Sequence, residues 1–142
     1  MRRSDETGVR WGRAVLAVVA SVLFWMLWSM GQYMAYLRYA DVDQAEETGS
    51  QVLWTAVPQL FASFVLVLIA TLIYGRARIA APAGAAVVLA FPVGMAVVSA
   101  VLGAAGGDPV APMIAQFVTG LAGAAAAYLF LRPKRRASSY GY

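Results

Sequence analysis

The chain has 142 residues, of which 61% are hydrophobic and 13% are charged, and its net charge is +4. In soluble proteins roughly a quarter of the residues are charged, so this composition indicates a protein whose main solvent is lipid. The absence of Cys and His excludes disulfides, thiolate catalysis, metal sites built on Cys or His, and Ser-His hydrolysis.

Four apolar segments occupy most of the chain, at residues 14–36, 52–74, 79–102 and 110–131. About 20 apolar residues cross a bilayer as a helix, whereas barrel strands would be about half as long and would alternate in polarity. We therefore expect an all-α integral membrane protein, a compact bundle of four transmembrane helices arranged as two hairpins. A basic N-terminus (residues 1–13) and a basic tail (residues 132–142) would flank this bundle.

The basic residues indicate the orientation of the bundle. All of the 11 basic residues except Arg38 precede the first span, separate the second from the third, or follow the fourth. The positive-inside rule then places both termini in the cytoplasm. The Arg-rich and Ala-rich composition is typical of a GC-rich genome, so we expect a multi-pass protein of a prokaryotic plasma (inner) membrane.

These basic ends predict contact with anionic lipid head groups. They do not indicate nucleic-acid binding, because the arginines lie where the topology requires them. The connections on the other side carry most of the acidic residues, which are Asp41, Asp43, Glu46, Glu47 and Asp108. A cation site at Asp41 and Asp43 is one interpretation. We favour a solvated loop without a ligand, since the Gly and terminal Glu of a calcium loop are missing.

The first span is expected to remain in the protein. It is rich in Trp and Phe, and no small-x-small cleavage site follows it. Trp25, Trp28, Gln32 and Tyr36 share one side of the predicted helix, near its outer end.

Proline affects the third span and the turn after it. Pro92 lies midway along the third helix and predicts a kink near Phe91, which could act as a hinge or be static; we favour a static kink. Asp108 is expected to be the N-cap of the fourth helix, with Pro109 at its first position.

The fourth span carries a predicted packing face of small residues, which are Gly120, Gly123, Ala124 and Ala127. Lipid offers no hydrophobic drive for helix association, so close backbone approach must supply it. The start of the third helix, Ala80 to Ala86, is the expected partner. A second copy of the chain could use the same face, but the short connection favours packing within one chain.

Polar residues within the spans gather in the predicted outer half of the bilayer. We identify six of them as a candidate polar cleft: Trp28, Gln32, Gln59, Ser63, Gln116 and Thr119. One interpretation is an outward-facing vestibule with apolar packing on the cytoplasmic side. The other, which we favour, is that these groups hydrogen-bond across helices and hold the bundle in register.

No ionisable residue lies deep within a span, so the proton relays and ion sites that such residues mark are not expected. We therefore predict no catalytic, cofactor-binding or metal-binding residues, and no enzyme. The expected function is that of a small accessory or scaffold protein, which associates with a larger membrane partner or with itself through small-residue helix faces. The alternative is a small oligomeric channel or carrier for a small ligand or lipid, using the outward-facing polar cleft.

Overall fold

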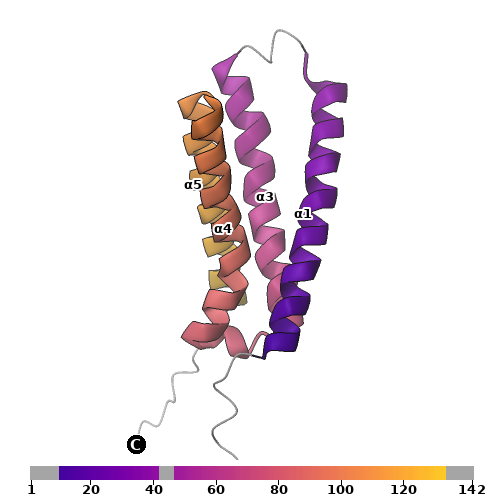
Figure 1. The fold of residues 1–142 in the computed structure, drawn as a ribbon, viewed down its shortest axis with the longest axis vertical. Coiled ribbons are helices and arrows are strands. Elements are labelled where there is room, and N and C mark those ends of the chain that lie inside the picture. Colours follow the sequence, from indigo (N-terminus) through magenta and orange to yellow (C-terminus); the bar gives the residue numbers. More distant parts are fainter. Residues whose placement is uncertain (1–9, 42–46, 134–142) are drawn as a thin grey trace, which may run out of the picture.

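A computed structural model of the chain describes residues 10–41 and 47–133, and within these residues all regular structure is helical. The four long helices are α1 (Trp11–Tyr39), α3 (Thr48–Tyr74), α4 (Pro82–Gly106) and α5 (Val110–Leu131), and they run side by side along the long axis of the molecule (Figure 1). Each is long and apolar enough to cross a membrane. For the described residues, the prediction of an all-helical chain with four membrane-length helices is confirmed. The predicted basic segments at residues 1–9 and 134–142, as well as Asp43 and Glu46, lie outside the described residues.

The third long helix begins later than the sequence pattern predicts. It starts at Pro82 instead of Ile79, and residues Arg78–Ala80 form the short 3-10 helix η1 before it. Proline is favoured in the first turn of a helix, because its missing N–H has no partner to lose there. The predicted fourth span coincides with α5, whereas α1 and α3 extend beyond their predicted apolar segments.

Gly107 ends α4, and it changes the role predicted for Asp108. This glycine has left-handed backbone angles, φ 77° and ψ 25°, which Gly adopts without the usual penalty. Its N–H donates to the carbonyl of Ala104 at 3.4 Å, and the Asp108 N–H donates to the carbonyl of Gly103 at 2.9 Å. This pair of bonds is the Schellman motif. The prediction that Asp108 caps α5 is wrong, because Pro109 occupies the N-cap position and no side chain caps the helix.

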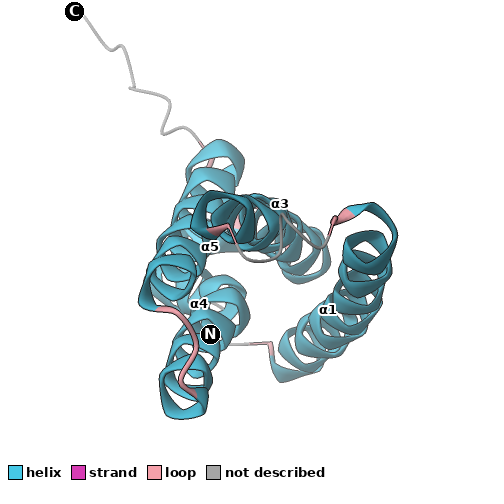
Figure 2. Ribbon diagram, turned by 90° about the horizontal axis from the view of Figure 1, so that it is seen from above, coloured by secondary structure: helices cyan, strands magenta, loops and turns pink. Residues whose placement is uncertain are grey.

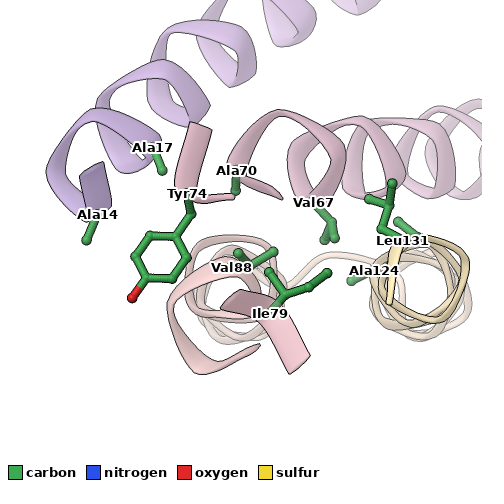
Figure 3. Packing of buried hydrophobic residues seen from close by; sticks show 10 residues of the cluster. Ala14, Ala17, Val67, Ala70, Tyr74, Ile79, Val88, Ala124 and Leu131 are labelled. Carbon is green, nitrogen blue, oxygen red and sulfur yellow. The ribbon is translucent and has the colours of Figure 1, made fainter. Parts of the chain in front are cut away.

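The buried core lies near one end of the bundle. We call this the arginine end, because Arg10, Arg76 and Arg132 border the helix termini there, and we call the opposite end the Asp108 end. The Arg76 side chain donates from Nε to the carbonyl of Leu131 at 2.8 Å, which ties the end of α5 to the connection between α3 and α4. The core consists of small and branched side chains (Figure 3), which are Ala14, Ala17, Val67, Ala70, Tyr74, Ile79, Val88, Ala124, Ala127 and Leu131.

The small-residue face of α5 packs against α3, not against the start of α4 as predicted. A Cβ at Gly123 would clash with the backbone carbonyl of Leu60, and one at Gly120 would lie 3.2 Å from Nε2 of Gln59. The start of α4 has a different neighbour, because Gly84 lies directly against the backbone of Arg78. At Gly84 the turn before α4 therefore takes the place that the sequence pattern assigned to α5.

Helix α1 is the least embedded of the four. Its buried residues, Ala14, Ala17 and Ser21, all lie in its first three turns. Beyond them α1 leans away from α3 towards the Asp108 end (Figure 1), and in the end-on view it stands apart from α4 (Figure 2). The bundle is thus tightly packed at the arginine end and more open at the other.

Candidate functional site

A cavity of about 500 Å³ lies at the Asp108 end, between α1 and the other three helices. We call it the polar cleft. Its lining comes from all four long helices and the turn before α5, and consists of Ser29, Gln32, Tyr33, Tyr36, Gln51, Trp54, Thr55, Ser99, Gly103, Asp108, Pro109, Pro112, Met113 and Gln116. The last buried residue of α1 is Ser21. Beyond it α1 diverges from the other helices, and this divergence leaves the space.

A proline in α3 accounts for the contact that joins α1 to α3 beside the cleft. Pro58 lies inside α3 and has no N–H to donate to the carbonyl one turn earlier, which is that of Trp54. The Gln32 side chain of α1 donates from Nε2 to that carbonyl at 3.0 Å. A backbone acceptor freed within one helix is thereby satisfied by a polar side chain of the neighbouring helix.

Aromatic rings strengthen the same contact. The rings of Tyr36 and Trp54 meet edge to face, with centroids 5.8 Å apart and an interplanar angle of 87°. This arrangement is one that aromatic pairs prefer. Both rings also line the polar cleft, so the contact that joins the helices forms part of the cleft surface.

Two of the six predicted cleft residues, Gln32 and Gln116, line the polar cleft. Gln59 lies deeper, where it and Gln116 border one gap among α3, α4 and α5 that is too narrow for water. Gln59 donates from Nε2 to the hydroxyl of Ser63 at 3.3 Å, and Ser63 is fully buried. The structure therefore brings Gln59, Ser63 and Gln116 together, with Gln116 at the boundary of the cleft.

Trp28 and Thr119 lie elsewhere. The Thr119 hydroxyl donates to the carbonyl of Ala115, in its own helix, at 2.7 Å. Trp28 lines a separate apolar groove of about 560 Å³ along the junction of α1 and α3, which is formed by Phe24, Leu27, Trp28, Gly31, Gln32, Ala35, Trp54 and Pro58. Gln32 and Trp54 border both cavities, so their hydrogen bond lies between the apolar groove and the polar cleft.

Two important cleft residues were missed by the sequence reasoning, Trp54 and Asp108. The sequence does contain a sign of Trp54, since it lies four residues before Pro58 and its carbonyl must lose a helical partner. Asp108 was assigned only a structural role in starting α5. No feature of the sequence places it in one cavity lining with residues of α1, because that arrangement depends on how the helices pack.

The groups that line the cleft can form hydrogen bonds and aromatic contacts. Its side chains supply amides, hydroxyls, aromatic rings and one carboxylate, and no group of His, Cys, Asp or Glu in the described part of the chain could hold a metal ion. The lining contains no nucleophile beside a base, which covalent catalysis would require. Comparison with protein-family models, with curated proteins and with solved structures finds no match to this chain.

Proposed function

We propose that this chain is a small non-enzymatic accessory protein of the membrane, and that it acts by holding a ligand or a partner segment in the polar cleft. One observation carries the proposal: the bundle is packed at the arginine end but leaves a cavity of about 500 Å³ with a polar lining at the Asp108 end. Amides and hydroxyls that face hydrocarbon are costly unless they are paired, and those that line the cleft are only partly buried. A cleft that keeps so many of them together is better explained by an occupant than by packing alone.

The proposal includes an orientation. With two helical hairpins and both termini in the cytoplasm, the arginine end would face the inner leaflet, where Arg13, Arg76 and Arg132 can contact anionic head groups. The cleft would then open towards the outer side of a prokaryotic inner membrane. This placement agrees with the acidic residues Asp41, Glu47 and Asp108 at that end.

The binding surface differs from the small-residue face predicted for a larger partner or a second copy. Gly120, Gly123, Ala124 and Ala127 are buried within the single chain, so they offer no free surface. A partner protein would have to enter the cleft or contact the exposed hydrophobic sides of the helices.

A channel or carrier remains the second candidate, favoured by the same cleft. In the single chain the cleft ends above the core, where Val67, Ile79 and Val88 are fully buried. Transport would therefore need a movement of α1 or a pathway between copies.

The test compares two threonines whose hydroxyl groups make similar hydrogen bonds. Thr55 lines the cleft and Thr119 does not, yet both donate to the carbonyl four residues earlier, at 2.8 Å and 2.7 Å. Native mass spectrometry of the protein, purified from its membrane in lipid nanodiscs, would measure the bound species. We expect Thr55→Val and Gln116→Leu to lose a bound molecule that the wild type and Thr119→Val retain. If all four proteins carry the same species in the same amount, the cleft is not the binding site.

A further inference from the structure

We infer that the polar cleft binds an organic cation whose charged group is a quaternary ammonium of the choline type. The inference rests on the proposed function, because it names the ligand class of the same cleft. It follows from three properties of the described lining: one carboxylate, three aromatic rings, and polar groups that can accept a hydrogen bond.

The charge of the lining has one sign. Among the residues that the structure describes, Asp108 is the only charged side chain that borders the cleft, and no Lys or Arg of these residues does. The nearest cation along α1, Arg38, is exposed and is not part of the lining. Asp41 and Glu47, exposed at the same end, add negative potential, which raises the local concentration of cations over about a Debye length, roughly 8–10 Å.

The aromatic rings offer a surface that suits a cation without N–H groups. Tyr33, Tyr36 and Trp54 line the cleft, and the near-perpendicular rings of Tyr36 and Trp54 form a corner with two aromatic sides. A quaternary ammonium cannot donate hydrogen bonds, and proteins recognise it through the negative faces of such rings. Trp is the strongest of these partners.

Two polar side chains of the cleft already donate hydrogen bonds within the protein. The Gln32 amide donates to the carbonyl of Trp54, and the Thr55 hydroxyl donates to the carbonyl of Gln51. Both side chains keep an oxygen that can accept, and the Gln32 amide also keeps its second N–H. These acceptors suit the hydroxyl of a choline-like ligand.

The test uses choline and dimethylbutanol, its uncharged carbon isostere, on the whole protein in nanodiscs of phosphatidylglycerol. Isothermal titration calorimetry would measure both, and tryptophan fluorescence would report on Trp54. We expect saturable binding of choline and at least about tenfold weaker binding of the isostere, in line with the strength of desolvated cation–π contacts and the Asp108 charge.

Matched variants assign the effect to the cleft. Tyr36→Leu and Asp108→Asn should each weaken choline binding by about tenfold. Tyr39→Leu and Asp41→Asn change the same residue types at exposed positions outside the lining. Tyr39→Leu should leave choline binding unchanged, and Asp41→Asn should weaken it far less than Asp108→Asn does, because an exposed charge acts on the cleft only through screened potential. Circular dichroism would verify that each variant is folded.

The source of the cation is resolved by the lipid. If a lipid head group supplies it, nanodiscs of phosphatidylcholine should weaken the apparent affinity for free choline by competition, relative to nanodiscs of phosphatidylethanolamine, which is also net neutral and so gives a similar surface potential. A soluble ligand predicts equal affinity in these two neutral lipids. Equal binding of choline and its isostere, or full affinity in Asp108→Asn, would overturn the inference. Either result would overturn only the choline assignment. The proposed function is tested separately, by the species bound to Thr55→Val and Gln116→Leu.

Discussion

Pro58 determines which side chain of α1 makes the contact with α3 beside the polar cleft. By removing one N–H it leaves the Trp54 carbonyl free, and Gln32 donates to that oxygen at 3.0 Å. In lipid no water is present to bond a free carbonyl. The proline therefore explains why a glutamine of the next helix donates to the carbonyl of Trp54. Bonds of this kind between membrane helices contribute about 0.6 kcal/mol on average.

This relation predicts a coupling between the two positions. Gln32→Leu should lower the free energy of unfolding in detergent by about 1 kcal/mol, because it leaves the Trp54 carbonyl unpaired. In a Pro58→Ala background the restored N–H of residue 58 can bond the same carbonyl, so the cost of Gln32→Leu should shrink. A double-mutant cycle measured by thermal or detergent unfolding gives the coupling. Strictly additive effects would show that the proline is not the reason for the Gln32 bond.

At the scale of helices, α3 and α5 approach each other closely. Gly123 lies so near the backbone of Leu60 that no Cβ fits between them, and Gly120 gives room to Gln59. Helix α1, by contrast, contributes only three small residues, Ala14, Ala17 and Ser21, to the buried interior. We therefore regard α3 and α5 as the rigid pair, and α1 as the element free to adjust around an occupant of the cleft.

Substitution of two glycines to alanine tests this difference. Gly123→Ala should destabilise the protein by about 1–3 kcal/mol, because the added methyl group forces α5 away from α3. Gly94→Ala in α4 is the matched control, since a Cβ there meets nothing within 4 Å; it should be neutral or stabilising by up to about 1 kcal/mol. Thermal unfolding of the two variants in the same detergent measures both effects. Equal losses of stability would mean that α3 and α5 do not pack as described.

At the scale of the whole molecule, packing is uneven along the long axis. The core cluster fills the arginine end (Figure 3), while the cavity occupies the Asp108 end. A bundle that is closed at one end suits binding from one side of the membrane. The direction in which the cleft opens therefore decides which compartment supplies the occupant.

Because the chain contains no Cys, single introduced cysteines can report its orientation. Gly49 and Ala77 are exposed residues at opposite ends of α3, and neither is buried by the fold. In intact cells we expect a membrane-impermeant thiol reagent to label Gly49→Cys but to label Ala77→Cys only after permeabilisation. Labelling of Ala77→Cys from outside would reverse the proposed topology, and the cleft would then face the cytoplasm.

The sequence by itself determined the number of long helices in the described part of the chain, the end of α3 and both ends of α5. Apolar length predicts a spanning helix because hydrocarbon requires every backbone polar group to be paired within the segment, and the fourth predicted span coincides with α5. Predictions from the sequence are wrong where one local pattern fits two structures. Asp108 could cap α5 or close the end of α4, and the left-handed Gly107 selects the second.

Only the tertiary structure decided which faces meet. The small residues of α5 could pack on any helix with a matching surface, and the close fit of Gly123 on Leu60 selects α3. Likewise, the outer polar residues are recognisable in the sequence, but their division between the cleft, the Gln59–Ser63 pair and the internal bond of Thr119 is not. The physical reason is that membrane-helix association depends on the fit of particular surfaces, and a periodic pattern shows which face is small or polar without showing what lies opposite.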